Sequence, residues 1–289
     1  MRIRAMTTDD IEAALAVRAP AFDGLPDDPP APPPEARPRA ADWWQTRTRH
    51  LIETGEGACV VAEDDREDDG GAGGVIGFAT SLQRDDLWCL ATFAVLPDRH
   101  GAGIGRALLD AVDPGGRAML SSSVHPGAMR TYHRRGFRLT PMMRLEGTLD
   151  RRGLPAVTGV REGSPADLDL LDAVDRRVRG AARRIDHRLM LDAGHRLLVV
   201  DSGTRAGYAS IDGDALEVLA ATDEDTAADL MRTVLAEGPG SAWVPHVSGA
   251  NSWAVAVGLD AGLLPRTTGY LATRGMAPPV PYVHHGSLL

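Results

Sequence analysis

Three glycines alternate with other residues at Gly101, Gly103 and Gly105, between a segment typical of a strand and one typical of a helix. A helix N-terminus presents unpaired N–H groups and the positive end of the helix dipole. Glycine lets the backbone approach a ligand closely and adopt positive φ angles. Together these features predict a cradle for phosphate groups. The competing interpretation is a tight turn without a ligand, and no Gly-Lys-Ser/Thr follows that would indicate a P-loop.

A tyrosine lies in the next predicted helix, within the sequence Tyr132-His133-Arg134-Arg135-Gly136-Phe137. A single tyrosine on a short helix is most often a packing residue. A phenol with an ordinary pKa of about 10 can also give a proton or a hydrogen bond to a leaving group. Its place downstream of the glycine turn favours a role at the same site.

As a set, these motifs resemble the GNAT superfamily of acyl-CoA-dependent N-acyltransferases. The family's Gln/Arg-x-x-Gly-x-Gly/Ala turn aligns with residues 100–105, and its Tyr-x-x-x-Gly-Phe element matches residues 132–137. His100 stands where the family prefers Gln or Arg, and Arg99 lies one place early. Because most of this motif works through backbone N–H groups, we expect the site to be kept.

The resemblance implies acetyl-CoA as co-substrate, held between a splayed strand and the glycine turn. The pantetheine arm would bond to the backbone of that strand, and the pyrophosphate to the N–H groups of the turn. A backbone N–H near Val95 would stabilise the oxyanion, and Tyr132 would act as general acid to the CoA thiolate. The implied CoA-binding residues are Phe93, Ala94, Val95, His100, Gly101, Ala102, Gly103, Ile104, Gly105 and Arg106.

N-acetyl transfer needs a neutral amine, although an alkyl ammonium has a pKa of about 10. Proton transfer from an ordinary tyrosine to a thiolate is uphill by about 2 kcal/mol, which a concerted step can accommodate. The general base is not evident from the sequence. Candidates are Asp85, Asp86, Glu53 and His125, and an ordered chain of water molecules is the alternative.

The first 148 residues are predicted to form a strand, two helices, three strands, the glycine turn with its helix, a strand, a helix and two closing strands. We therefore predict an α/β (α+β) fold of two tandem GNAT-like domains, each a mixed, mostly antiparallel sheet flanked by helices. A proline-rich loop is predicted at residues 25–38, and an acidic hairpin turn at residues 64–74. The acetyltransferase domain is expected to span residues 1–149.

Residues 156–275 repeat this pattern weakly and are predicted to form a degenerate GNAT-like domain, followed by a tail at 276–289. Where the first half has glycines, the second has Asp223, Glu224 and Asp225, which would repel a pyrophosphate. Gly258 stands in the position of the tyrosine. An unrelated α/β domain is the alternative for this half.

The composition excludes several classes of protein. With 289 residues, 43% of them hydrophobic, and a net charge of −9, the chain is typical of a globular protein, not one that coats nucleic acid or an anionic membrane. All its basic residues are arginine, which suggests a GC-rich bacterial genome. The two cysteines are expected to be buried free thiols in the cytoplasm.

The expected function is acetyl-CoA-dependent transfer of an acetyl group to a primary amine of a small molecule or a protein, with no metal. Partners other than the amine acceptor are not predicted, and the oligomeric state, a homodimer included, stays open. The alternative is a non-catalytic acyl-CoA-binding or regulatory protein. Against a transcriptional regulator, no basic recognition helix is evident.

Overall fold

The computed structural model of the chain describes residues 1–23, 37–55, 57–64 and 74–289. Most of the predicted proline-rich loop, and nearly all of the acidic turn, lie outside these described residues. The last two residues of the predicted loop, Arg37 and Pro38, instead begin helix α2. Proline is tolerated there because the N–H groups in the first turn of a helix have no intrahelical partners.

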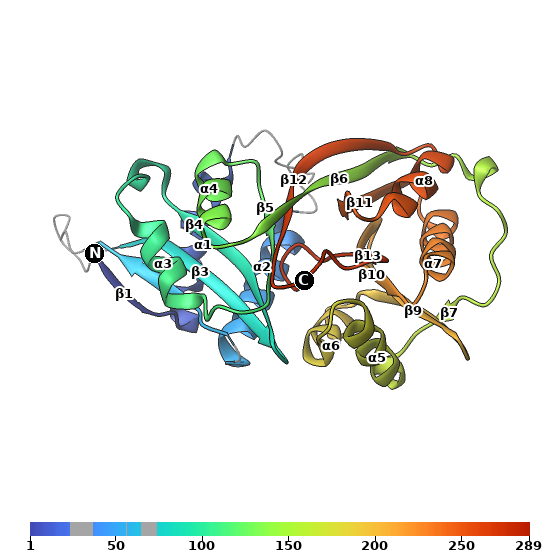
Figure 1. Ribbon diagram of the computed structural model, residues 1–289, viewed down its shortest axis with the longest axis horizontal. Coiled ribbons are helices and arrows are strands. Elements are labelled where there is room, and N and C mark those ends of the chain that lie inside the picture. Colours follow the sequence, from blue (N-terminus) through green and yellow to red (C-terminus); the bar gives the residue numbers. More distant parts are fainter. Residues whose placement is uncertain (24–36, 56, 65–73) are drawn as a thin grey trace.

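The same order of helices and strands occurs twice along the chain (Figure 1). The first half contains β1 (Arg2–Ala5), α1 (Ile11–Phe22), α2 (Arg37–Glu53), β2 (Val60–Glu63), β3 (Val75–Arg84), β4 (Leu87–Val95), α3 (Ile104–Val112), β5 (Ala118–Ser122), α4 (Pro126–Arg134) and β6 (Arg138–Thr148). The second half contains β7 (Arg161–Glu162), α5 (Leu168–Val178), α6 (Arg184–Asp192), β8 (Arg196–Ser202), β9 (Arg205–Asp212), β10 (Ala215–Ala221), α7 (Glu224–Glu237), β11 (Ser241–Ser248), α8 (Ser252–Asp260) and β12 (Leu264–Arg274). A short strand, β13 (Tyr282–Val283), follows in the tail.

The predicted fold class is confirmed: helices flank one large sheet that is mostly antiparallel. Its strand order is β1-β2-β3-β4-β5-β12-β6-β11-β10-β9-β8-β7, with β13 added beside β10. Within the described ranges, the parallel pairs are β4 with β5 and β10 with β11. These two pairs occupy equivalent positions in the repeated order of elements.

The two halves exchange their last strands. Strand β12 of the second half pairs with β5 of the first, and β6 of the first half pairs with β11 of the second. Between these pairs, β6 and β12 lie side by side and antiparallel, and Figure 1 shows them crossing together from one half to the other. The sequence predicted that residues 137–148 close the first half as two strands. They form one strand, and all its partners come from the second half.

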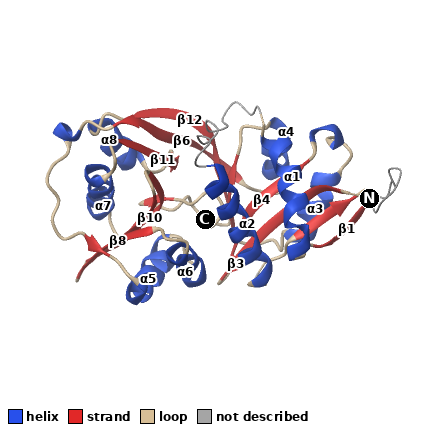
Figure 2. Cartoon of the chain, turned by 180° about the vertical axis from the view of Figure 1, so that it is seen from behind, coloured by secondary structure: helices blue, strands red, loops and turns tan. Residues whose placement is uncertain are grey.

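Helices cover both faces of each half. In the first half, α3 and α4 pack on one face, with Ile104, Leu108 and Tyr132 in the core. In the second half, α7 and α8 pack on the equivalent face. The other faces, covered by α1 with α2 and by α5 with α6, merge into one hydrophobic core between the halves. Helix α2 and the C-terminal segment lie next to each other in this region (Figure 2).

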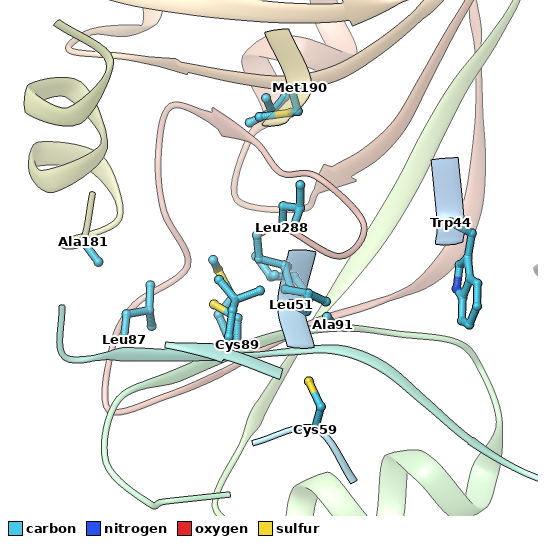
Figure 3. Close-up of a cluster of buried hydrophobic side chains, with 14 of the residues drawn as sticks. Trp44, Leu51, Cys59, Leu87, Cys89, Ala91, Ala181, Met190 and Leu288 are labelled. Atoms are coloured by element: carbon cyan, nitrogen blue, oxygen red, sulfur yellow. The ribbon is translucent and has the colours of Figure 1, made fainter. Parts of the chain in front are cut away.

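The C-terminal tail is buried in this shared core. Leu288 and Leu289 have no exposed surface. Figure 3 shows Leu288 beside Leu51 of α2 and above Cys89 and Ala91 of β4. Buried apolar side chains of this size contribute roughly 1.5–3 kcal/mol each. The tail therefore belongs to the folded core and holds the two halves together.

Buried charges fix the tail and the interface between the halves. The Arg183 guanidinium donates to both carboxylate oxygens of Asp175 and to the main-chain oxygen of Leu288. Asp186 of α6 accepts two hydrogen bonds from Arg84 of β3, at 2.7 and 2.8 Å. Both carboxylates are stabilised as anions despite their burial. His50 and Arg84 hold the pKa of Asp186 below its usual range, and Arg183 with His187 does the same for Asp175.

Within the described ranges, no helix has the length and apolar character required to span a bilayer. Cys59 and Cys89 are both buried and form no disulfide, which confirms that part of the prediction. Burial raises the pKa of each thiol.

Candidate active site

The glycine turn links β4 to α3 and contains two residues in the left-handed conformation. Gly101 has φ of 84° and Gly103 has φ of 82°, and Gly103 is the N-cap of α3. A Cβ atom at either position would meet no atom within 4 Å. Gly105 differs, because a Cβ there would lie 3.0 Å from Cζ of Phe93. The first two glycines thus serve backbone conformation, and the third serves close packing of helix on strand.

The N–H groups of residues 101–106 point to an anion site. Within the described ranges they donate no backbone hydrogen bond, and the first helical bond of α3 runs from Ala107 N–H to the Gly103 carbonyl at 3.0 Å. Open space at Gly101 and Gly103 leaves room for a ligand to reach this backbone. Unpaired donors at the positive end of a helix are the physical requirement for binding phosphate.

A gap opens between β4 and β5 next to this turn. The two strands pair only from Trp88 with Ala118 to Leu90 with Leu120. Beyond Leu90, β4 has a register irregularity against β3 and continues to Val95 without a partner on the β5 side. A bulge bends a strand and interrupts its pairing. The predicted splayed strand is therefore present, and Phe93–Val95 of β4 pair with β3 but have no strand partner on the β5 side.

Two histidines lie at the mouth of the gap. The His100 ring is hydrogen-bonded through Nε2 to the Val95 carbonyl at 3.0 Å, and its centroid is 5.5 Å from that of His125. His125 caps α4, because its Nδ1 accepts from the N–H of Ala128. Burial and the neighbouring His100 lower the pKa of His125, which favours the neutral ring. Arg99 forms an ion pair with Asp64 at 2.8 Å, so its side chain is held beside the turn.

Tyr132 is 4% exposed and lies in the core between α3, α4 and the sheet. Its ring packs edge-on against Phe137, with centroids 6.0 Å apart. Among the described residues its hydroxyl has no hydrogen-bond partner, and it is not one of the fully enclosed polar atoms. Burial raises the pKa of Tyr132 above 10, so the phenol stays protonated. Full proton transfer to a thiolate is therefore more uphill than for an ordinary tyrosine.

Three of the candidate bases lie away from the gap. Asp85 and Asp86 form the turn between β3 and β4, at the far end of β4 from the glycine turn. Asp85 accepts a hydrogen bond from the N–H of Ala182, and Asp86 pairs with Arg117 at 2.6 Å. Glu53 is exposed at the end of α2. Asp85 thus contacts the second half, Asp86 contacts Arg117 of the first half, and Glu53 faces solvent.

The equivalent gap in the second half contains the C-terminal tail. Strands β10 and β11 pair at a single position, Ala215 with Trp243. Further along β10, Leu219 and Ala220 pair with β13. The tail thus takes the edge that corresponds to the free edge of β4. Asn251 holds it there, accepting from the Tyr282 N–H at 2.7 Å and donating to the Pro279 carbonyl at 3.1 Å.

Helix α7 of the second half also differs from α3. Its N-cap is Asp223, whose carboxylate accepts the N–H of Thr226 at 2.8 Å, so a side chain already binds at this N-terminus. In α8, Gly258 lies against the sheet, and a Cβ there would come within 2.7 Å of Cδ1 of Leu145. This position therefore has no room for a tyrosine.

Several polar residues that the sequence did not single out meet between the halves, on the α2 side of β4. They are Trp43 and Arg47 of α2, Thr92 of β4, His195 immediately before β8, Glu217 of β10 and His285 of the tail. They come from distant parts of the chain and share no local motif. Only the alternation of Glu217 with apolar neighbours in a predicted strand hinted that this carboxylate faces a core.

Comparison with known proteins places part of the chain in a family. Residues 55–139 match the sequence profile of the acetyltransferase (GNAT) domain. This range includes β3, β4, the glycine turn and Tyr132. A comparison with curated protein sequences gave no significant match.

Solved structures share the fold over almost the whole chain. A protein from Pyrococcus horikoshii assigned to the acetyltransferases superimposes with a TM-score of 0.70 at 16% identity, covering 99% of this chain and 91% of that one. A GCN5-related N-acetyltransferase from Sphaerobacter thermophilus gives 0.56 at 16% identity, covering 96% of both. A tandem GNAT protein from the clavulanic acid biosynthesis pathway gives 0.57 at 14% identity, covering 96% and 99%.

These likenesses extend through both halves, which agrees with the repeated order of elements. The profile match falls on the half that has the open gap and the glycine turn. Residues 55–139 thus match the GNAT acetyltransferase domain, and the whole chain has a fold similar to that of a tandem GNAT protein.

Proposed function

We propose that the chain transfers an acetyl group from acetyl-CoA to a primary amine of a small molecule or a protein, at the β4–β5 gap of the first half. The observation that carries this proposal is the combination, in one half only, of a free β4 edge, unpaired N–H groups at residues 101–106 and a protonated Tyr132. The second half has none of the three.

The residues of the gap fit an acyl-CoA. The backbone of Phe93, Ala94 and Val95, on the side that faces β5, would bind the pantetheine amides. The His100 ring would have to leave the Val95 carbonyl to admit them. The N–H groups of residues 101–106 would bind the pyrophosphate, as charge-assisted hydrogen bonds to a helix N-terminus. Bound acetyl-CoA supplies an activated acyl group as its thioester.

Two groups of the protein then have separate roles in the reaction. A backbone N–H near Val95 stabilises negative charge on the acyl oxygen. Tyr132, whose raised pKa keeps it protonated, donates a hydrogen bond to the departing sulfur and passes its proton only as the carbon–sulfur bond breaks.

We assign residues 1–149 to the acyl-CoA domain, 156–275 to a GNAT-like domain without a CoA site, and 276–289 to a tail that completes the interface. The alternative function is a non-catalytic acyl-CoA-binding or regulatory protein. The hydroxyl of Tyr132 favours the enzyme, because packing alone would be served by phenylalanine. Thiol release from acetyl-CoA across a panel of amines separates the two: an enzyme turns over with at least one amine, whereas a sensor binds CoA without amine-dependent release.

Replacing Gly103 with leucine is expected to weaken CoA binding by about 10- to 100-fold, the value of one or two lost hydrogen bonds to a charged group. The side chain would fill the open space through which the pyrophosphate reaches the backbone. Gly115→Leu is the matched control, because Gly115 also has φ of 82° and open space around its Cβ. Calorimetry that gives equal CoA affinity for both variants would show that the turn does not bind the phosphates.

Titration of the whole chain with acetyl-CoA should saturate at one molecule per chain. The second half is expected not to bind, because β13 takes the free edge of β10 and Asp223 caps α7. Two equivalent sites per chain in equilibrium dialysis would contradict this assignment.

A further inference from the structure

A cavity of about 370 Å³ lies between α2 and the second half. Asp42 and Trp43 line it from α2, and Asp192, His195 and Asp212 line it from the other side. This volume is in the range of small-molecule sites. Asp192 is paired with Arg188 at 3.0 Å, and two more carboxylates lie beside an aromatic ring. Carboxylates next to an indole favour an organic cation over an anion or a neutral polar ligand.

Trp43 connects this cavity to the interior. Its ring centroid lies 5.1 Å from that of His195 and 6.3 Å from that of His285. Nε2 of His285 lies 3.5 Å from Oε2 of Glu217. The Glu217 side chain keeps 22% of its surface exposed, whereas His285 keeps only 3%. A partly exposed carboxylate thus lies next to His285, whose ring is close to Trp43 on the cavity wall.

The backbone of β10 sets the direction of the Glu217 side chain. Pairing with β9 shifts register between Leu216 and Val218, so Glu217 lies at a bulge. Leu216 packs in the core beneath α7 and α8, and Val218 packs in the core shared by the two halves. A bulge turns a side chain out of the regular alternation, and such irregularities occur often beside active sites.

Arg47 joins the same cluster to the splayed strand. It lies one turn after Trp43 on α2, and its Nη2 is 3.4 Å from the hydroxyl of Thr92. Thr92 immediately precedes the free segment Phe93–Val95 of β4. The guanidinium is buried, and its Nε has no hydrogen-bond partner in the described ranges. Arg47 therefore links α2 to the strand that lines the CoA gap, and its charge also acts on Glu217.

The electrostatic surroundings of Glu217 bring its titration near neutral pH. Burial, and the charge of Asp212 from β9, raise the pKa of Glu217 to about 7, against the opposing effect of Arg47 from α2. Burial and the positive Arg47 hold the pKa of His285 well below its usual value, so this ring of the tail is neutral. Arg47 is itself influenced by Arg18 of α1, whose charge, with burial, lowers the pKa of Arg47 to about 9.

We propose that the cleft lined by Asp42, Trp43 and Asp212 admits the acceptor as a small organic cation without a carboxylate, and that Glu217 takes a proton from its ammonium group. This inference rests on the acetyl transfer proposed above. The second half then supplies a base for the reaction, which gives the strand-exchanged second half a direct part in the chemistry.

The proton balance is simple. The ammonium nitrogen gives one proton to Glu217, which passes it to solvent, and the neutral nitrogen bonds to the acyl carbon as the bond from that carbon to sulfur breaks. Tyr132 supplies a proton to the sulfur and recovers one from the new amide nitrogen. The products are the N-acetylated amine, CoA with a free thiol, and one proton released.

The test uses two probes that differ in one group: cadaverine, a diamine, and lysine, the same carbon chain with a carboxylate. Binding of each to the full chain loaded with CoA is measured by calorimetry, and acetylation by thiol release. The variants are Glu217→Gln, which keeps the shape and removes the base, and Glu224→Gln as the control in the same half. Glu224 is at the start of α7 and belongs to neither cluster.

We expect cadaverine to bind at least 10-fold more tightly than lysine, and Glu217→Gln to weaken cadaverine binding about 10-fold. Turnover in Glu217→Gln should fall by about 10²-fold, the usual effect of losing a general base. The wild-type rate should rise with pH through 7, as Glu217 ionises, and the variant should lose this step. Glu224→Gln should match the wild type in both assays.

Three results would overturn the inference. They are lysine binding as well as cadaverine, unchanged cadaverine binding and pH profile in Glu217→Gln, and no cadaverine binding by the wild type. The calorimetric binding measurement decides the inference even if no acetylation is seen. Amine binding at this cleft without thiol release would count against the proposed function alone.

Discussion

Tyr132→Phe is expected to lower turnover by about 10²- to 10³-fold, the usual loss when an acid or a hydrogen-bond donor to the leaving group is removed. The substitution deletes one oxygen and keeps the ring that packs against Phe137. Because the hydroxyl has no hydrogen-bond partner among the described residues, its loss should leave stability and CoA affinity nearly unchanged.

The pH dependence of the rate gives a second test of the role of Tyr132. Since burial raises the pKa of Tyr132, its phenol stays protonated above pH 10, where an ordinary tyrosine would ionise. The rate should therefore show no fall up to pH 10 from loss of this proton. Phe137→Leu is the matched control, because it disturbs the same aromatic contact and leaves the hydroxyl. Wild-type turnover in Tyr132→Phe with an amine that the wild type acetylates would remove Tyr132 from the mechanism.

Residues 1–150 expressed alone are expected to be insoluble or unfolded, with no activity. Without the second half, β5 loses its partner β12, and β6 loses both of its neighbours. Leu271 and Ala272 of β12, both fully buried, would also leave the core of the first half. Two open strand edges and an exposed apolar face favour aggregation.

Co-expression tests whether strand exchange is the cause. Residues 1–150 and 151–289, produced together as two chains, should assemble into a soluble pair that binds CoA, because each half would receive its missing strand. The same segments expressed separately should not. Full activity of residues 1–150 alone would show that the halves are independent, and would also exclude Glu217 from the reaction.

The local parts of the site could be predicted from the sequence because their geometry is set within one short segment. The glycines at 101 and 103 need positive φ, and the helix that follows them gives its N–H groups their direction. The order of elements up to Tyr132 was also predicted, because strands and helices have distinct hydrophobic periods. Helix α3 begins at Ile104, between the second and third glycines of the turn, because Gly103 is its cap.

Strand partners could not be predicted in the same way. The pattern of β6 indicates a strand, but it carries no information on whether β5 or β11 lies beside it. The strand even continues through Pro141, which the sequence suggested as a break, because β12 has a register irregularity next to that residue. The place of the tail depends on Asn251 and on buried arginines far along the chain.

The candidate base could not be predicted from the sequence either. Asp85 and Asp86 were considered because they precede the splayed strand in sequence, yet a strand of nine residues separates them from the glycine turn in space. Glu217 and His285 reach the α2 side of β4 only through the folding of the second half and the tail. No spacing rule links residues whose contact depends on the exchange of strands.

A crystal structure of the full chain with bound CoA tests the central claim most directly. We expect one CoA per chain, with its pantetheine arm beside Phe93–Val95, its pyrophosphate on the N–H groups of residues 101–106, and its sulfur within hydrogen-bonding distance of the Tyr132 hydroxyl. The His100 ring should have left the Val95 carbonyl, to which it is bonded at 3.0 Å without the ligand. CoA bound between β10 and β11 with β13 displaced, or a pyrophosphate away from the glycine turn, would contradict the account.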